Sequence, residues 1–393
     1  MAAAVSRSRS SELLVLTNTP TPYRIPFLNV LSDVLQERGA GLRVLFCAMR
    51  EPHRRWNLQL DEQRYPWKIL PGWHPSVSSW HPHFNPTIVT QLREIRPAWI
   101  LMGGAWNLPT TLLASQRYIA GDAYRIFWSE GHSRAVLHPR GLIAAARRCA
   151  LRTYDAFAVP NGASARFIRA EAGDSRPVMF LPNTIDDDFF KTPSRADRQA
   201  ARADLGIPWS KSVMVSICQL EDRKGVLELV AGFERLPREM RKDAMLVLIG
   251  TGSLRAALDA KASELNCGEV HLAGHLDMVD IRRWLRAADV FVLNSKRDPN
   301  PISVIEAAFS GLPLIVSCQA GNVEDLLRDE LNGFLLEHHS ADHVALALQR
   351  FLASDGETRR QMGARSAETA HQGFQRRWVA ENFANALMTL ERA

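Results

Sequence analysis

Short apolar runs alternate with helix-like segments along most of the chain. The runs expected to form strands occupy residues 12–17, 42–47, 99–102, 125–128, 156–159, 213–217, 245–249, 270–273, 290–293 and 314–316. When strands alternate with helices, the crossovers favour parallel pairing, with helices covering both faces of the sheet. The alternation therefore predicts an α/β protein built on parallel sheets.

The alternation is interrupted once, between Leu181 and Gly206, by two prolines and the acidic triplet 186–188. A chain of 393 residues is long enough for two domains of typical size. We therefore expect two Rossmann-like domains and a C-terminal helix, whose apolar residues recur at near-helical spacing. The expected bounds are 11–185, 186–373 and 374–393.

Composition excludes several classes of protein. Hydrophobic residues make up 46% and charged residues 23%, as in ordinary globular proteins. No apolar run approaches the roughly 20 residues that span a bilayer, and the short run after the N-terminal arginines does not predict a cleaved signal peptide. Five cysteines without paired spacing are typical of a reduced, cytoplasmic protein. The net charge of +6 is modest and no nucleic-acid motif accompanies it, so nucleic acid is not an expected partner.

Two acids frame a turn between two apolar strands. Asp298 follows the strand 290–293, and Glu306 lies on a helix that Pro301 can start, because proline is tolerated at the first helical position. The backbone of Asn300, Pro301, Ile302 and Ser303 would then face outward at the carboxyl end of a strand. Such a turn can hold phosphate on amides while one acid holds a sugar hydroxyl and the other a ribose. The alternative is an ordinary crossover with two solvated acids.

The same turn resembles the two-acid motif of retaining glycosyltransferases of the GT-B fold, family 4 (glycosyl transferases group 1). Asp298 stands in its first position, where the family has glutamate, and Glu306 in its second. Further blocks of the family follow in its order over the C-terminal half: L-P-N-T-I-D at 181–186, the strand, turn and Lys-Gly helix start at 213–233, and L-V-L-I-G-T-G-S-L-R at 246–255. The resemblance implies two Rossmann-like domains facing a cleft, with the C-terminal helix crossing back to the first domain.

Lys224 opens a helix after a strand, where its ammonium can neutralise a diphosphate held at the helix N-terminus. The family motif has an arginine five residues earlier, where this chain has Gln219, and a glycine where it has Cys218. Arg223 can supply the missing charge. The alternative for Lys224 is a surface lysine at a helix start.

Gly250 and Gly252 follow another strand. They suggest a dinucleotide fingerprint, but Arg255 replaces its third glycine, so nicotinamide binding is not favoured. The resemblance implies that this turn lines the nucleotide pocket, and a tight turn without a ligand is the alternative.

Two motifs of the first half follow strands. The segment from Thr19 to Arg24 resembles a Pro-x-Pro-Tyr-Arg variant of a family loop, which implies that Tyr23 and Arg24 contact the acceptor. In the segment 128–132, either Glu130 or His132 is expected near the transferred sugar, and the alternative for His132 is a surface loop residue.

No metal site or resident cofactor is expected. The triplet 186–188 is interpreted as the hinge and the cap of the next helix. His74, His81 and His83 lie in a Trp- and Pro-rich run without carboxylates at ligand spacing, which favours a loop whose aromatic rings stack on sugar.

Arginines gather between Gly131 and Tyr154, where there is no acid: Arg134, Arg140, Arg147, Arg148 and Arg152. A solvated helix face is one interpretation. The other is contact with anionic lipid head groups or a polyanionic acceptor, which would place the protein at the inner face of a membrane.

The resemblance as a whole implies a hexosyltransferase-type enzyme of cell-surface polysaccharide biosynthesis. It would move a sugar from a nucleotide diphosphate sugar, with UDP as the expected nucleotide, to a hydroxyl of a glycan or lipid-linked acceptor. The second domain would bind the donor and the first the acceptor. The alternatives are a nucleotide-sugar epimerase of similar fold and a noncatalytic sugar-nucleotide-binding protein.

Overall fold

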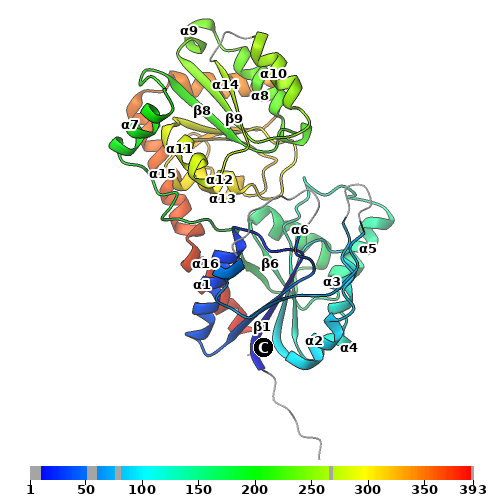
Figure 1. Ribbon diagram of the computed structural model, residues 1–393. Helices are drawn as coiled ribbons and strands as arrows, with labels where there is room; N and C mark the ends of the chain where they lie inside the picture. The colour runs from blue at the N-terminus through cyan, green and yellow to red at the C-terminus, as the bar shows by residue number, and fades with distance from the viewer. Residues whose placement is uncertain (1–9, 51–59, 76–80, 265–268, 391–393) are drawn as a thin grey trace, which may run out of the picture. The chain divides into compact units, whose positions relative to one another are not determined.

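The computed structural model describes residues 10–50, 60–75, 81–264 and 269–390. The chain divides into two compact units (Figure 1). The first unit comprises residues 1–184 and 376–393, and the second comprises residues 185–375.

The first unit contains a seven-stranded parallel sheet in the order β3-β2-β1-β4-β5-β6-β7. Its strands are β1 (Ser10–Thr17), β2 (Gly41–Phe46), β3 (Trp67–Ile69), β4 (Pro97–Gly103), β5 (Tyr124–Trp128), β6 (Ala156–Val159) and β7 (Val178–Phe180). Its helices are α1 (Arg24–Gln36), α2 (Ile88–Ile95), α3 (Pro109–Ala114), α4 (Arg117–Ala120), α5 (Leu142–Leu151), α6 (Gly162–Ala172) and α16 (Arg376–Thr389), with a 3-10 turn, η1 (Leu60–Glu62). The strand order reverses between β1 and β4, which is where open α/β sheets bind ligands.

The core of this unit lies on both faces of the sheet, because successive strand residues point to opposite sides. In β1, Leu13 and Val15 join one buried cluster, whereas Leu14 and Leu16 join another. The first cluster includes buried residues of α1 and of α16, which lie side by side in Figure 1. The C-terminal helix therefore returns to the first unit, as the family resemblance implied.

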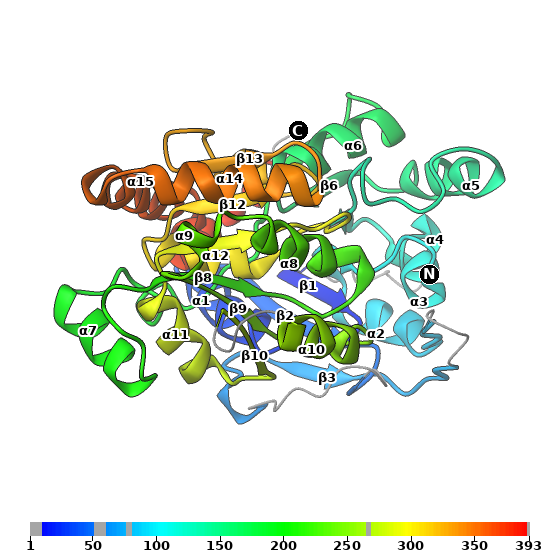
Figure 2. The same ribbon diagram turned by 90° about the horizontal axis from the view of Figure 1, so that it is seen from above.

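The second unit contains a six-stranded parallel sheet in the order β10-β9-β8-β11-β12-β13. Its strands are β8 (Ser212–Ile217), β9 (Ala244–Ile249), β10 (Val270–Gly274), β11 (Val290–Leu293), β12 (Leu314–Ser317) and β13 (Gly333–Leu336). Its helices are α7 (Arg195–Asp204), α8 (Val226–Glu234), α9 (Arg238–Arg241), α10 (Arg255–Glu264), α11 (Met278–Ala287), α12 (Ile302–Phe309), α13 (Val323–Leu326), α14 (Ala341–Ala353) and α15 (Gly356–Phe374), with a 3-10 turn, η2 (Asp222–Lys224). Figure 2 shows α8 and α14 side by side, and both contribute to one buried cluster. The strand order reverses between β8 and β11.

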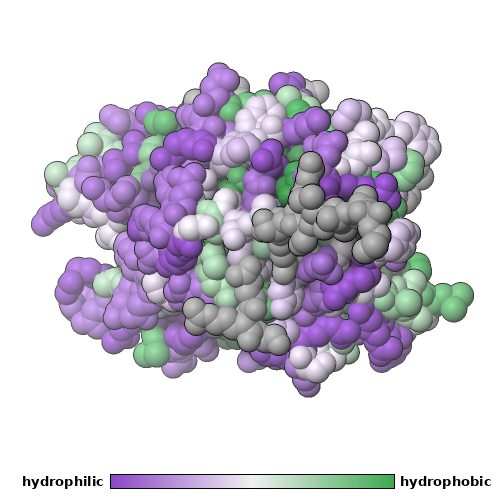
Figure 3. All heavy atoms as spheres, turned by 90° about the horizontal axis from the view of Figure 1, so that it is seen from below, coloured by the Kyte–Doolittle hydropathy of each residue, from purple (hydrophilic) through white to green (hydrophobic). Residues whose placement is uncertain are grey.

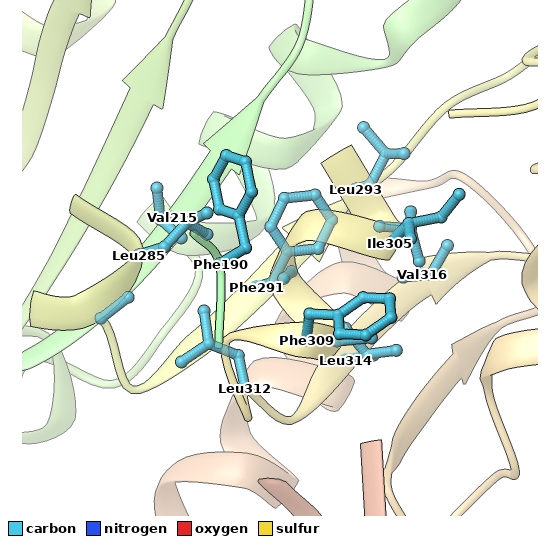
Figure 4. Close-up of a cluster of buried hydrophobic side chains, with 14 of the residues drawn as sticks. Phe190, Val215, Leu285, Phe291, Leu293, Ile305, Phe309, Leu312, Leu314 and Val316 are labelled. Atoms are coloured by element: carbon cyan, nitrogen blue, oxygen red, sulfur yellow. The ribbon is translucent and has the colours of Figure 1, made fainter. Parts of the chain in front are cut away.

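A second cluster fixes α12 against this sheet. Phe291 of β11 and Phe309 of α12 are fully buried, and Figure 4 shows them among Ile305, Leu314 and other apolar side chains. Rigid packing of this helix determines where its first turn and Glu306 lie. The two parallel sheets with helices on both faces confirm the predicted α/β fold class.

Candidate functional site

The loops after β8 and β11 bring Lys224 and Asp298 into contact. The two strands are neighbours and parallel, so their carboxyl ends meet at one edge of the sheet. Lys224 Nζ donates to Asp298 Oδ2, and Ser295 Oγ lies 3.4 Å from the same oxygen. The side chains of the pair are only 10% and 7% exposed. A buried cation and carboxylate therefore lie at the point where the strand order reverses.

Gly225 allows these two loops to approach each other. Its φ of 61° is left-handed, and a Cβ there would lie 2.1 Å from the carbonyl oxygen of Asn294. Asn294 Nδ2 donates to the Gly225 carbonyl at 3.1 Å. Only glycine fits this position, because any side chain would push Lys224 away from the end of β11.

Arg223 and Gln219 also contact each other. Arg223 Nη2 donates to Gln219 Oε1, and its Nε donates to Glu221 Oε2 at 2.8 Å. The arginine side chain is 33% exposed. The substitute cation predicted from the sequence therefore lies on the same loop as Lys224, with part of its charge balanced by Glu221.

The glycine turn after β9 packs on this loop. A Cβ at Gly250 would lie 1.9 Å from the carbonyl oxygen of Cys218, and one at Gly252 would lie 2.3 Å from that of Leu220. Backbone N–H groups of Cys218 and Leu220 donate to Ile249 and Thr251 at 3.0 and 2.9 Å. Close approach of two backbones thus explains both glycines without a ligand, and joins the β9 turn to the Lys224 loop.

The N-terminus of α12 follows Asp298 closely in the chain, after the carboxyl end of β11. The helix begins at Ile302, so Pro301 precedes it, contrary to our expectation that proline starts it. Proline also has no N–H, so the amides available for phosphate in this turn are those of residues such as Ile302 and Ser303. No described side chain caps them. Asn300 lies immediately before Pro301, whose carbonyl accepts a 2.9 Å hydrogen bond from Asn322 Nδ2.

Glu306 lies one turn further along α12. Burial raises the pKa of its carboxyl above the ordinary value of 4.5, to about 7. Glu306 is half-buried, and the cause of the shift is the loss of water around the charged form. A carboxylate in such surroundings is stabilised by any ligand that supplies hydroxyl donors.

The first unit has a cavity of about 220 Å³ at its own strand-order reversal. Its lining comes from the loops after β1, β4 and β5: Asn18, Thr19, Thr21, Tyr23, Arg24, Gly104, Ala105, Trp128 and Glu130. Three of the residues predicted from the sequence, Tyr23, Arg24 and Glu130, therefore line one cavity.

Arg24 and Glu130 form an ion pair in this cavity, with Arg24 Nη2 3.0 Å from Glu130 Oε1. Arg24 also donates to Thr17 Oγ1 at 3.1 Å and lies over the Trp128 ring, 4.3 Å from its centroid. Asn183 Nδ2 lies 3.3 Å from the same Glu130 oxygen. The sequence did not indicate the contacts of Thr17 and Asn183. Thr17 ends the predicted strand 12–17, and Asn183 lies in the motif at 181–186.

His132 lies elsewhere. Its side chain is only 1% exposed, so it is not the surface loop residue that we considered. The described lining of the cavity includes Glu130 but not His132. Of the two residues considered for contact with the transferred sugar, Glu130 lines this cavity.

The arginines between Gly131 and Tyr154 do not all face solvent. Arg147 is 3% exposed, and its Nε donates to Glu171 Oε2 of α6 at 2.8 Å. It also donates to the carbonyl of His138. The interpretation of this arginine as part of a solvated or lipid-facing surface is therefore wrong, because an acid from another helix pairs with it.

The histidines and the acidic triplet have structural contacts. His74 Nδ1 and His83 Nδ1 lie 3.0 Å apart, and Asp186 accepts a hydrogen bond from the backbone of Phe189 at 2.9 Å. Among the described residues, no group of three or more His, Cys, Asp or Glu is arranged to hold a metal ion. No helix in the described part of the chain is long and apolar enough to cross a membrane.

The second unit is similar to a known family. A sequence profile of the family described as Glycosyl transferases group 1 matches residues 197–369. The lipopolysaccharide core biosynthesis glycosyltransferase LpsE of Rhizobium meliloti is 30% identical over 187 residues, which are 47% of this chain and 52% of that protein. The chain spans about half the length of the first curated relatives that it matches.

One relative matches along nearly the whole chain. The GDP-mannose-dependent monoacylated alpha-(1-6)-phosphatidylinositol monomannoside mannosyltransferase of Corynebacterium glutamicum is 24% identical over 396 residues, which cover 97% of this chain and 99% of that protein. Among solved structures, Anabaena HepE in complex with UDP has a TM-score of 0.76 at 17% identity, covering 96% of this chain and all of HepE. HepE is thus similar to this chain in fold, and that fold is GT-B.

Proposed function

We propose that this chain, whose residues 197–369 match the profile of the glycosyl transferases group 1 family, is a retaining glycosyltransferase that uses a nucleotide diphosphate sugar. The observation that carries the proposal is the contact between Lys224 and Asp298 at the carboxyl edge of the second sheet. The uncapped first turn of α12 follows Asp298 in the chain, and the half-buried Glu306 lies one turn further along that helix. This combination offers a cation and amides for a diphosphate and two acids for hydroxyl groups.

In the proposed reaction, Lys224 and the first-turn amides of α12 bind the diphosphate. Negative charge on that group grows as the bond to the sugar breaks, so these contacts strengthen toward the transition state. Arg223 adds a second positive charge on the same loop. Asp298, released from Lys224 when phosphate binds, accepts a hydrogen bond from a sugar hydroxyl and orients the ring. Glu306 accepts hydrogen bonds from the ribose.

The donor is proposed to be a UDP-sugar. The solved HepE structure contains UDP, and a second structure of HepE contains UDP-glucose. The mannosyltransferase of C. glutamicum is described as dependent on GDP-mannose, so GDP-mannose is the competing donor. A panel containing both nucleotides distinguishes them.

The cavity of the first unit is the proposed acceptor site. Arg24 and Glu130 there can donate to and accept from hydroxyl groups, and Trp128 provides an apolar surface beside them. The proposed acceptor is a hydroxyl of a glycan or a lipid-linked saccharide in the synthesis of a cell-surface polysaccharide. The description of the R. meliloti relative as an enzyme of lipopolysaccharide core biosynthesis supports this choice.

Contact with the inner face of a membrane is part of the proposal. Leu137, Leu142 and Ile143 are 67%, 89% and 46% exposed, next to the exposed Arg140. Figure 3 shows apolar residues gathered at the margin of the molecule where α5 lies. Exposed leucines beside arginines are typical of surfaces that insert shallowly into anionic bilayers. Such contact would bring a lipid-linked acceptor to the protein.

The donor site is tested by Lys224→Ala. Loss of a charge-assisted hydrogen bond costs roughly 1.5 to 3 kcal/mol, so we expect affinity for the nucleoside diphosphate to fall about ten- to hundredfold, and turnover to fall with it. The measurement is isothermal titration calorimetry with UDP and GDP. Lys261→Ala is the matched control, because Lys261 is a partly exposed lysine paired with Glu234. Equal nucleotide affinity in wild type and Lys224→Ala would contradict the assignment.

A further inference from the structure

Two exposed aromatic rings lie opposite each other on the loop after β3. Trp73 is 69% exposed and Phe84 is 42% exposed. Their backbones exchange two hydrogen bonds, at 2.9 and 3.0 Å, which makes them a directly opposed antiparallel pair. Side chains of such a pair project to the same side of the ribbon. The two side chains therefore project to the same side, and we call them together the aromatic platform.

The platform rests on a rigid, buried polar support. Asn85 is fully buried, and its Nδ2 lies 2.9 Å from the carbonyl oxygens of both Cys47 and Leu70. Thr110 Oγ1 lies 2.8 Å from the carbonyl oxygen of His83 and 2.9 Å from the backbone nitrogen of Asn85. A support with this many satisfied hydrogen bonds holds the rings in place before any ligand arrives, which lowers the entropic cost of binding.

Gly72 shows how closely this support is packed. A Cβ at that position would lie 2.2 Å from Asn85 Nδ2 and 2.7 Å from the carbonyl oxygen of Phe84. Single exposed aromatic residues are common and need no function. Two exposed aromatic side chains on one directly opposed pair, on a base held by buried hydrogen bonds, are better explained by a ligand.

The support also connects the platform to the cavity that contains Arg24 and Glu130. The backbone N–H groups of Cys47 and Ala48 donate to the carbonyls of Thr17 and Asn18 at 2.9 and 2.8 Å, and Asn18 lines that cavity. The connected segments follow β1, β2 and β3, which are parallel neighbours, so platform and cavity lie at the same edge of the sheet.

The cavity alone is small for a ligand of several rings. Its volume of about 220 Å³ is below the roughly 300 to 1,000 Å³ of typical ligand pockets. An acceptor longer than one sugar must therefore extend onto neighbouring surface. The quadrupole of an aromatic ring makes its face partially negative, which attracts the polarised C–H groups of a pyranose ring.

We propose that Trp73 and Phe84 form a second acceptor subsite that stacks on a pyranose ring distal to the one held in the cavity. This proposal rests on the proposed function, because it makes the acceptor an oligosaccharide rather than a single sugar. The competing occupant is a lipid bilayer, since exposed tryptophans also anchor proteins at membrane interfaces.

The test is binding of the full-length protein to an array of mono- to hexasaccharides cleaved from bacterial surface polysaccharides. We expect wild type to bind longer saccharides better than monosaccharides, and Trp73→Ala and Phe84→Ala each to weaken that preference, by about tenfold for Trp73→Ala. Trp73→Tyr keeps a ring and should retain binding. Trp378→Ala is the matched control, because Trp378 is 43% exposed on α16 and should be without effect.

Several results would overturn the subsite. Wild type that binds no oligosaccharide on the array, or binding that is equal in wild type and Trp73→Ala, would remove it. Vesicles of phosphatidylglycerol that bind wild type but not Trp73→Ala, with saccharide binding unchanged, would assign the platform to the membrane. UDP affinity, measured in parallel, reports on the donor site alone, so failure of the proposed function is seen separately.

Discussion

At the scale of single residues, the half-buried Glu306 has a carboxyl whose pKa is raised by burial. Its folded pKa of about 7 exceeds the ordinary 4.5, so the folded chain holds a proton that the unfolded chain has already released between these values. Stability must therefore fall as the pH rises through this window. An ionised carboxyl in these surroundings lowers the free energy of unfolding. Hydrogen bonds from ribose hydroxyls to Glu306 would explain why the chain has a glutamate here.

We expect Glu306→Gln to stabilise the protein while weakening nucleotide binding. At about pH 8 the glutamine variant should be more stable to heat by on the order of 1 to 3 kcal/mol, and the difference should disappear toward about pH 5. Affinity for UDP should fall about ten- to hundredfold, because the charged acceptor is lost. Thermal unfolding across pH and calorimetry with UDP measure the two effects.

Glu368→Gln serves as the control, since Glu368 is exposed on α15 and should change neither property. If Glu306→Gln binds UDP as tightly as wild type does, Glu306 does not contact the ribose. If the stability of Glu306→Gln shows the same pH dependence as that of wild type, the Glu306 carboxyl is not the titrating group.

The limits of sequence reasoning are clearest in the burial of individual side chains. The sequence placed Lys224 and Asp298 after two strands of one parallel sheet, whose carboxyl ends meet at the same edge. The contact between the two side chains agrees with that prediction. Arg147 and His132 could not be placed in this way. The partner of Arg147 is Glu171, on a different helix, and no local pattern reveals such a pairing.

At the scale of elements, the strongly periodic segments were predicted and the weak ones were missed. All ten predicted strands are present. The three missed strands, β3, β7 and β13, have three or four residues and lie at sheet edges, where tertiary pairing rather than intrinsic propensity decides. Pro301 was placed one position too far into α12, which is within the usual uncertainty of helix boundaries.

The surface around α5 makes a prediction about membranes. We expect the protein to float with vesicles containing phosphatidylglycerol at low salt and to be released at high salt, because each arginine near an anionic surface contributes about 1 kcal/mol. Leu142→Ser combined with Arg140→Gln should reduce flotation.

Arg147→Gln should instead lower the stability of the protein, because it leaves Glu171 without its buried partner.

Leu346→Ser is a control for loss of an exposed leucine, as Leu346 is 56% exposed on α14 of the second unit. Wild type that stays at the bottom of the gradient at low salt would show that α5 does not bind membranes. We would then expect the acceptor to be a soluble saccharide rather than a lipid-linked one.

At the scale of the whole molecule, the C-terminal helix α16 packs into the core of the first unit. Val379, Phe383 and Leu387 of α16 are at most 1% exposed and belong to the same cluster as residues of α1. Burying each such side chain stabilises by about 1.5 to 3 kcal/mol. The first unit should therefore depend on residues that are distant in sequence.

We expect truncation after Gln375 to destabilise the first unit selectively. Hydrogen exchange measured by mass spectrometry should speed up in α1 and β1, whereas α8 and β11 should exchange as in wild type. UDP binding should persist, because the proposed donor residues all lie in the second unit. Unchanged protection of α1 would contradict the role assigned to α16.

The central claim is that this chain transfers a sugar with retention of its anomeric configuration. The most direct measurement is proton NMR of UDP-glucose and GDP-mannose incubated separately with the protein in EDTA, following the anomeric signals as the donor is consumed. We predict that one α-linked donor yields first an α-configured product, by slow hydrolysis or by transfer to an added saccharide, and that Lys224→Ala slows its appearance. A β-configured first product, an epimerised donor, or turnover that requires added manganese would contradict the account.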